Sequence, residues 1–335
     1  MGFVQEMKKK AQEYGNRLVF PEGTEDRTLK AARAIIDEKI ASELFLIGDT
    51  DKVKAAAELV GIGLDGIRII DPLKSEWLDS FTEAYYEKRK SKGMTEEEAR
   101  AEVSKDLGFG AMMLTQDKAD ALVAGAFNTT ANVLRTGLKI VGTKPGKKTA
   151  SSCFLVDTKN PRLGVNGLFI FSDSAVNPEP TSEQLADIAC SAAHSCRIFT
   201  GAEPIVALLS FSTKGSGGDK DENILRVREA IKILQERKPD FVFDGEMQLD
   251  CAIVPHVMKK KAPGSPVKGL ANTLIFPDLG SGNIGYKLVE RIAGAEAFGP
   301  FLQEFARPIS DLSRGCSVDD IITTAAVTLV QAGKR

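Results

Sequence analysis

The 335-residue sequence contains little histidine and little cysteine, and this scarcity restricts its chemistry. It has two histidines, His194 and His256, and five cysteines at positions 153, 190, 196, 251 and 316. The cysteines are odd in number, irregularly spaced and without a CxxC pair, and the histidines are not paired as metal ligands usually are. We therefore expect free thiols, no metal site, and a general base that is a carboxylate.

A strong net charge and long apolar runs are also missing. The formal net charge is −2, so we expect no broad basic surface for nucleic acid or for an anionic membrane. No apolar run reaches transmembrane length, and residues 1–10 lack the apolar core of a secretory signal. These absences predict a cytoplasmic protein in which an anionic substrate is met by a local cluster of Arg and Lys.

Strand-like apolar runs alternate with helical patterns along the chain. In the first part such runs occupy 17–20, 44–47, 67–70 and 121–124. Repeated strand, turn and helix predict a parallel sheet with crossover helices, whose ligands bind beyond the carboxyl ends of the strands, here the loops at Pro21, Gly48, Asp71 and Gly125. Gly142–Lys148 is a linker by composition, so we place a domain boundary there.

The segment Pro308–Ile321 predicts a turn that leads into a helix N-terminus. Ser317 can cap the helix, and Asp319 and Asp320 suit the positive end of its dipole. Pro308 should end a preceding helical pattern, and Gly315 should supply the backbone freedom of the turn. Such a terminus binds anions, but the same residues fit an ordinary capped surface helix, and chemistry alone leaves both interpretations open.

Two further segments have the same ambiguity. Gly125–Arg135 follows a strand and opens a helix with the hydroxyls of Thr129 and Thr130, which suits either an anion site or a simple cap. Lys88–Lys90 ends a helix and suits either a ligand site or a solvated C-terminal turn.

Three stretches resemble the phosphate acetyl/butyryltransferase family. They are Asp311–Ser317 (Asp-Leu-Ser-Arg-Gly-Cys-Ser), Phe276–Lys287 and Ala293–Pro300, and the similarity extends over essentially the whole chain. The resemblance implies reversible transfer of an acetyl group between CoA and phosphate. It also implies small-molecule substrates (CoA, acetyl-CoA, phosphate and acetyl phosphate), no permanently bound cofactor, and a homodimer.

The resemblance further implies an α/β fold of two domains, each a three-layer αβα arrangement of the isocitrate and isopropylmalate dehydrogenase type. The site would lie in the cleft between the domains. The first domain would comprise residues 1–147 plus 307–335, with the C-terminal helix completing its sheet, and the second would comprise residues 148–306.

The family's motif assigns the chemistry of the acyl transfer to the segment around Asp320. The CoA thiol has a reference pKa of roughly 8.5 and needs a base, which the resemblance places at Asp320. Ser313 and Arg314 would stabilise the charge that develops on the carbonyl oxygen. CoA and the acyl phosphate can react directly in a ternary complex, so we expect no acyl-enzyme on Cys316.

The phosphoryl group would be bound by arginines. The stretch Tyr86–Gly93 matches a family segment in which the residue at Arg89 is an active-site arginine. Arg89, Arg135 and Arg314 would hold phosphoryl oxygens, with Thr130 beside them. The family often has His-Ser-x-x-Asp-x-x-Arg where this chain has Asn128, Thr129 and Asn132 before Arg135, so roles of the missing His and Asp do not carry over.

Gly280–Gly285 reads GxGxxG after the strand-like run 273–276. A dinucleotide site needs a second strand about 20 residues later, and residues 299–308 carry no strand-like run. We favour a turn near the coenzyme, with Gly282 and Asn283 in contact with CoA. The alternatives are a phosphate butyryltransferase, an NAD-dependent dehydrogenase on the same fold, and a non-catalytic acyl-CoA-binding regulator.

Overall fold

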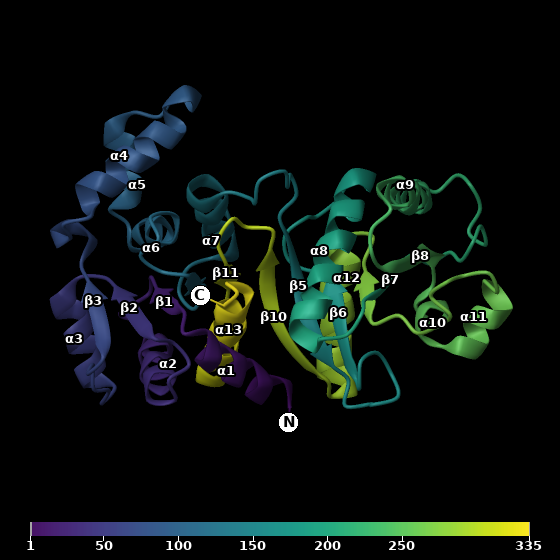
Figure 1. The fold of residues 1–335 in the computed structure, drawn as a ribbon, viewed down its shortest axis with the longest axis horizontal. Helices are drawn as coiled ribbons and strands as arrows, with labels where there is room; N and C mark the ends of the chain where they lie inside the picture. The colour runs from purple at the N-terminus through teal and green to yellow at the C-terminus, as the bar shows by residue number, and fades with distance from the viewer. Residues whose placement is uncertain (1, 335) are drawn as a thin grey trace. The chain divides into compact units, whose positions relative to one another are not determined.

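The computed structural model describes residues 2–334, and the chain divides into two compact units. Unit 1 comprises residues 1–146 and 305–335, and unit 2 comprises residues 147–304. The sequence had placed the boundaries at 147/148 and 306/307. Each unit contains strands and helices of its own (Figure 1).

Unit 1 is built on a parallel sheet with the strand order β3-β2-β1-β4-β11. The strands are β1 (Arg17–Phe20), β2 (Glu43–Ile47), β3 (Ile67–Ile70), β4 (Ala121–Ala124) and β11 (Ile309–Asp311). Every residue of β1 and β4 is buried, which explains why both read as continuous apolar runs rather than as alternating patterns. The first four strands confirm the predicted runs, whereas β11 was not predicted.

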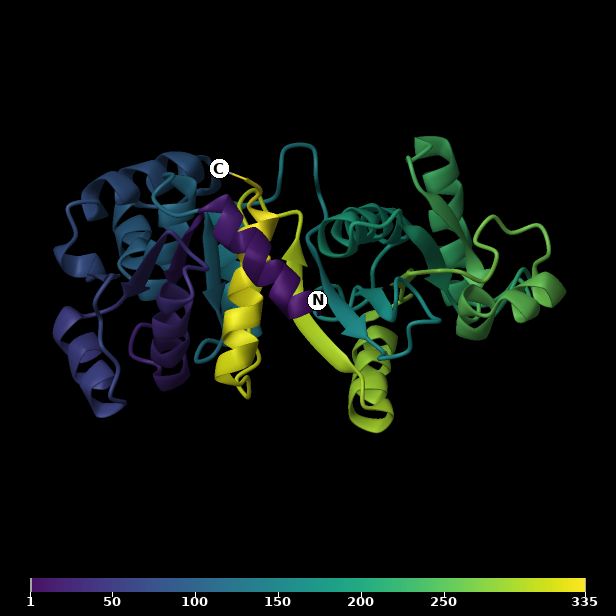
Figure 2. The same ribbon diagram turned by 60° about the horizontal axis from the view of Figure 1, so that its bottom comes forward.

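The helices of unit 1 bring the two ends of the chain together. α13 (Val318–Gln331) lies beside α1 (Phe3–Tyr14) and contacts β1, β4 and β11 (Figure 2). The buried Nδ2 of Asn16 donates to the carbonyls of Leu329 and Gly333 at 2.9 and 2.7 Å. The other elements are α2 (Asp26–Asp37), α3 (Thr50–Leu59), η1 (Pro72–Lys74), α4 (Leu78–Arg89), η2 (Lys90–Lys92), α5 (Glu96–Val103), α6 (Asp106–Thr115), α7 (Thr130–Thr136) and η3 (Gly137–Val141).

Unit 2 contains a mixed sheet with the strand order β10-β5-β6-β9-β7-β8. β5 pairs antiparallel with β10 and β6, and the remaining neighbours are parallel. The strands are β5 (Ser151–Asp157), β6 (Leu168–Ser172), β7 (Ile205–Leu209), β8 (Val242–Met247), β9 (Thr273–Ile275) and β10 (Glu296–Gln303). The helices are α8 (Ser182–Thr200), α9 (Glu222–Arg237), α10 (Leu249–Ile253), α11 (Pro255–Lys261) and α12 (Leu279–Ala293).

Some sequence predictions for the chain after residue 248 are wrong. Residues 296–303 form the strand β10, not a helix that ends at Pro308. The strand pattern is hidden because the register shifts between Phe298 and Phe301, around Gly299 and Pro300. The helical segment after β8 is divided into α10 and α11 at Pro255, whose ring cannot continue a helix. Within residues 2–334, no helix is long and apolar enough for a membrane span.

A buried ion pair joins the start of β1 to the turn before β4. Nε and Nη2 of Arg17 donate to Oδ2 and Oδ1 of Asp120 at 3.0 and 2.9 Å, and the Arg17 backbone N–H donates to Oδ2 at 2.8 Å. Arg17 is 8% exposed and Asp120 is 7% exposed. The hydrogen bonds that Arg17 donates to Asp120 raise the pKa of its guanidinium above the ordinary value. Removal of Asp120 would leave the buried guanidinium with only the exposed carboxylate of Asp117, which lies 3.6 Å from Nη2, to compensate its charge.

We expect Asp120→Ala to lower the free energy of unfolding by about 3 kcal/mol, the low end for breaking a buried pair, because it removes three hydrogen bonds of Arg17 and leaves only the exposed Asp117 beside the guanidinium. Urea denaturation followed by circular dichroism measures this loss. Glu13→Ala is the control, since it removes the exposed partner of Lys9 and should cost less than about 1 kcal/mol. Equally small losses in the two variants would show that the Arg17–Asp120 pair contributes no more than a surface pair.

Candidate functional site

A pocket of about 960 Å³ lies beyond the carboxyl ends of β1 and β4 in unit 1. We call it pocket A. It is lined by Pro21, Glu22, Thr24, Glu25, Asp26, Arg27, Lys30, Glu102, Lys105, Asp106, Leu107, Gly108, Phe127, Asn128, Asn132, Arg135, Thr136 and Lys139. The pocket is therefore located where ligands of parallel α/β sheets bind, and the loops predicted at Pro21 and Gly125 both reach it.

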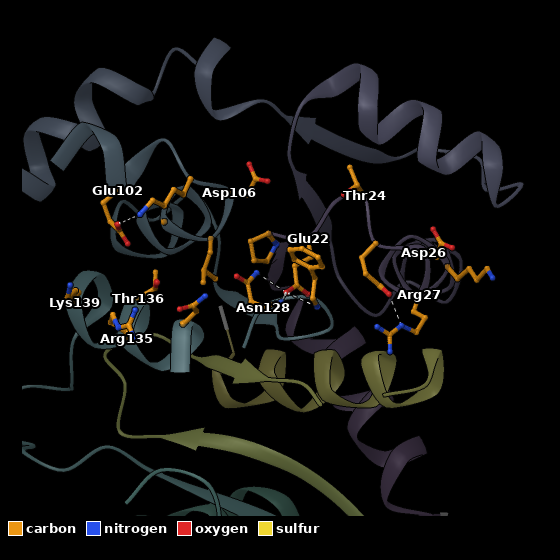
Figure 3. Close-up of a pocket in the computed structure, with 18 residues that line it drawn as sticks. Glu22, Thr24, Asp26, Arg27, Glu102, Asp106, Asn128, Arg135, Thr136 and Lys139 are labelled. Atoms are coloured by element: carbon orange, nitrogen blue, oxygen red, sulfur yellow. Dashed lines mark hydrogen bonds and ion pairs between the residues drawn. The ribbon is translucent and has the colours of Figure 1, made fainter. Parts of the chain in front are cut away.

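The cations of pocket A fall into two groups. Arg27 is paired with Glu25 at 2.6 Å, and Lys105 is paired with Glu102 at 2.6 Å. Arg135, Lys139 and Lys30, by contrast, form no ion pair with any residue in the 2–334 range. Figure 3 shows the side chains of Arg135 and Lys139 together at one end of the pocket, with Arg27 at the opposite end. The end with Arg135 and Lys139 brings two unpaired cations together, so an anionic group would gain the most electrostatic energy there.

The floor of pocket A is the carboxylate of Glu22. Four backbone N–H groups, those of residues 125, 126, 127 and 128, donate to it at 2.7–3.2 Å. The Nδ2 of Asn128 donates to it as well, at 2.9 Å (Figure 3). Glu22 is only 7% exposed, so these donors replace the water that a buried carboxylate loses. The sequence suggested Pro21 as a ligand loop but did not single out Glu22.

Glu22 changes the interpretation of Gly125–Arg135 as an anion site. The turn does bind an anion, but that anion belongs to the chain, so the amides of residues 125–128 are not available to a substrate. Thr129 caps α7 by accepting from the Asn132 N–H, as the alternative interpretation predicted. Arg135 extends from α7 into pocket A.

Thr130 and Asp311 form a buried pair beside this turn. The Thr130 hydroxyl donates to Oδ2 of Asp311 at 2.6 Å, whereas the buried Oδ1 has no partner among the described residues. Asp311 is 2% exposed, and burial raises the pKa of its carboxyl to about 7. A Cβ at Gly125, where φ is +117°, would come within 2.6 Å of Oδ1, so only glycine fits there. The predicted contact between Thr130 and phosphate stays a prediction.

The turn before α13 has the predicted form but not the predicted glycine geometry. The Cys316 N–H donates to the Ser313 carbonyl at 2.9 Å, and Ser317 and Asp320 form a capping box. Gly315 is not among the residues with positive φ, so the expected need for glycine freedom is wrong. Ser313, Arg314 and Asp320 are exposed, and Oδ2 of Asp320 accepts from the Ser317 N–H at 2.8 Å.

Arg27, which the sequence interpretation missed, connects this turn to pocket A. Its Nη1 donates to the carbonyls of Arg314 and Cys316, each at 2.8 Å. Its Nη2 donates to the Ala126 carbonyl at 3.0 Å. The hydrogen bond that Arg27 donates to Glu25 raises the pKa of the guanidinium above its ordinary value, so Arg27 stays charged at neutral pH and the connection persists. An arginine at a helix start carries no sequence signal for such a role.

The three cations at the end of α4 make different contacts. Nζ of Lys88 donates to the carbonyls of Ile140 and Val141 at 2.6 and 3.2 Å, and Lys90 pairs with the exposed Glu87. Arg89 lines a second pocket of about 460 Å³, which we call pocket B. Pockets A and B share Glu102 and Lys139 in their linings. Arg89 and Arg135 therefore lie in adjoining pockets of unit 1.

Gly282 and Asn283 lie in unit 2, inside the first turns of α12 rather than in the predicted turn before a helix. A Cβ at Gly282 would come within 2.4 Å of the Asp173 carbonyl oxygen, so the glycine permits close packing of the helix. Nδ2 of Asn283 donates to the Ser174 carbonyl at 3.3 Å. Both residues serve packing here, and their contact with CoA stays a prediction.

Cys316 is a poor nucleophile in this setting. Its side chain is buried, and burial raises the pKa of the thiol to about 11, with Asp320 among the smaller causes. Very little thiolate therefore exists at neutral pH. Within residues 2–334, no group of three or more His, Cys, Asp or Glu side chains could hold a metal ion.

Asp311 predicts a specific dependence of stability on pH. Its folded pKa of about 7 lies above the ordinary value of 3.8, so the folded state holds a proton that the unfolded state loses. The folded state is thus penalised progressively as pH rises from 4 to 7, by on the order of 4 kcal/mol at most. Asp311→Asn removes this penalty. The free energy of unfolding of the variant, compared with that of the natural chain, should therefore increase as the pH rises from 4 to 7.

Thermal unfolding of both proteins between pH 4 and 8 measures the difference. Asp65→Asn, at an exposed acid of the same unit, is the matched control and should keep a constant difference from the natural chain. A constant difference for Asp311→Asn as well would mean that Asp311 ionises as an ordinary carboxyl.

Comparison with known proteins identifies relatives along the full chain. The sequence profile of the phosphate acetyl/butaryl transferase family matches residues 2–329. The phosphate acetyltransferase of Treponema pallidum is 61% identical over 100% of both chains, and that of Thermoanaerobacterium thermosaccharolyticum is 48% identical over 99% of this chain and 100% of its own. The crystal structure of a phosphotransacetylase from Streptococcus pyogenes superposes with a TM-score of 0.92, 38% identity and 98% coverage of each chain. The chain therefore belongs to the phosphate acetyl/butaryl transferase family.

Proposed function

We propose that the chain is a phosphate acetyltransferase, which transfers an acetyl group reversibly between CoA and inorganic phosphate. The observation that carries this proposal is the 61% identity, over both full lengths, to a relative of that name. The cations of unit 1 agree with it, because Arg135 and Lys139 are unpaired at one end of pocket A. CoA enters as a substrate and not as a permanently bound cofactor.

In the proposed reaction Asp320 takes the proton of the CoA thiol. Its Oδ2 is used by the capping box, while Oδ1 accepts no hydrogen bond from the described residues and remains open to a substrate. The thiolate then attacks the acyl carbon of acetyl phosphate, and negative charge develops on the carbonyl oxygen. The exposed side chains of Ser313 and Arg314 would donate to that oxygen. Phosphate leaves with the electron pair of the broken C–O bond.

The phosphoryl group would be held by Arg89, Arg135 and Arg314. Planar guanidinium groups bind phosphoryl oxygens with two hydrogen bonds, and none of the three forms an ion pair within residues 2–334. Thr130 could donate to phosphate only after its hydroxyl leaves Asp311. Arg27 acts as a positioning residue, because it holds the backbone of Arg314 through a carbonyl.

We also propose the assembly and the architecture that the family resemblance implies. The two units would form the two-domain arrangement of the isocitrate and isopropylmalate dehydrogenase type, with substrates bound in its cleft. A homodimer is supported by Ile284, Leu288 and Ile292, which recur every four residues on α12 and are 60, 51 and 79% exposed. The free cysteines agree with a cytoplasmic location.

The activity test is release of free thiol from acetyl-CoA. We expect release that depends on added phosphate and proceeds without added metal or nicotinamide. Propionyl-CoA and butyryl-CoA assayed in parallel define the acyl preference, and we expect acetyl-CoA to have the highest kcat/KM. Folded protein that releases no thiol with any of the three would refute the proposal, and NAD reduction with a hydroxy acid would favour a dehydrogenase instead.

Asp320→Asn tests the proposed base. The amide oxygen can still accept from the Ser317 N–H, so the cap should survive while the capacity to take a proton is lost. We expect kcat to fall roughly 10²–10⁴-fold with little change in either KM. Asp319→Asn, at the adjacent exposed acid of the same turn, is the control and should keep its kcat. If Asp320→Asn lowers the melting temperature but leaves kcat within a few-fold, Asp320 is only a helix cap.

A further inference from the structure

Pocket B contains two polar atoms that the protein itself does not satisfy. The hydroxyl oxygen of Tyr85 and Nε of Arg89 are both buried, and neither has a hydrogen-bond partner among residues 2–334. Both residues line the pocket, together with Lys92, Gly93, Met94, Glu98, Ala101, Glu102 and Lys139. Tyr85 is only 1% exposed. Buried polar groups are almost always paired, so two unpaired donors in one pocket indicate a missing acceptor.

The charges around pocket B favour an anion as that acceptor. Its two carboxylates are already engaged, because Glu98 accepts from the Thr95 N–H at 2.9 Å and Glu102 pairs with Lys105 at 2.6 Å. Arg89, Lys92 and Lys139 form no ion pair with any described residue. The pocket thus combines three uncompensated cations with a buried hydroxyl, and an anion entering it would neutralise charge.

Tyr85 is suited to donate rather than to accept. Burial raises the pKa of its hydroxyl above the ordinary value, so the group keeps its proton at neutral pH. A buried hydroxyl without a partner is destabilising, and phenylalanine would fill the same space without that cost. Packing therefore does not explain the tyrosine, whereas a ligand oxygen within reach of the hydroxyl does.

We propose that Tyr85 and Arg89 jointly bind a phosphoryl oxygen of a substrate, with the hydroxyl of Tyr85 as the neutral donor and Nε of Arg89 as the charged one. The proposal rests on the proposed function and assigns Tyr85 a substrate-binding role. Lys92 and Lys139 balance the remaining charge. Two substrates carry this chemistry: the phosphoryl group of acetyl phosphate or inorganic phosphate, and the phosphate ester groups of CoA.

Tyr85→Phe tests the proposal, because it removes only the hydroxyl. We expect the KM of the substrate whose phosphoryl group enters pocket B to rise about tenfold, the value of one hydrogen bond to a charged group. The melting temperature should stay unchanged or rise, since an unpaired buried hydroxyl is removed. A purely structural role for Tyr85 would instead lower the melting temperature and leave every KM unchanged. Tyr86→Phe, at a neighbour that does not line pocket B, is the matched control.

The two sources of the phosphoryl group give different results. If KM rises for phosphate and acetyl phosphate but not for CoA, the transferred phosphoryl group occupies pocket B. If KM rises for CoA, a CoA analogue without the 3′-phosphate is compared next. If the KM of this analogue is the same for the Tyr85→Phe variant and the natural chain, the 3′-phosphate occupies pocket B. Either result supports the proposal.

Unchanged KM values in an active Tyr85→Phe variant would overturn the proposal while leaving the proposed activity intact. If the natural chain itself releases no thiol, titration calorimetry with inorganic phosphate still decides the question. Binding that is about tenfold weaker in Tyr85→Phe than in Tyr86→Phe supports the site. Equal binding, or no binding to any of the three proteins, refutes it.

Discussion

The carboxylate of Glu22 is the constraint on which the site in unit 1 depends. It comes from the end of β1 and holds the loop after β4 through four backbone N–H groups and the Asn128 side chain. That loop leads directly into α7, so the position of Arg135 follows from the position of Glu22. Because the carboxylate is buried, loss of its charge would leave several donors unpaired at once. The anchor is therefore stiff, and it fixes the floor of pocket A.

A second constraint connects the C-terminal segment to the same loop. Arg27 donates to carbonyls on both sides, at Ala126 and at Arg314 and Cys316. Asp311 adds a third link through the Thr130 hydroxyl. Segments from three distant parts of the chain thus converge around the carboxyl ends of β1, β4 and β11. The turn with Ser313, Arg314 and Asp320 is held by its backbone, which leaves the three side chains free for the proposed chemistry.

Local signals predicted most of the elements. The strands of unit 1 before residue 125 are largely apolar runs followed by Gly, Pro or Asp, and each run of this kind was found as a strand. The cap at Ser317 was predicted from residue type and spacing, and Ser317 forms a capping box with Asp320. β10 could not be recognised, because Gly299 and Pro300 interrupt its pattern and its pairing with β5 is what makes it a strand. The helix α6, apolar on all sides, also lacks the amphipathic period that predicts a helix.

The sequence by itself determined the family, the parallel α/β arrangement of unit 1 and the residue types of the site, since motifs and periodicity are properties of neighbouring positions. Only the tertiary structure decided that the anion on the 125–128 loop is Glu22, that Arg27 holds the turn before α13, and that Arg89 shares a pocket with the buried hydroxyl of Tyr85. Hydrogen bonds between residues a hundred or more positions apart leave no local pattern. The burial that raises the pKa of Asp311 is likewise set by the elements packed around it.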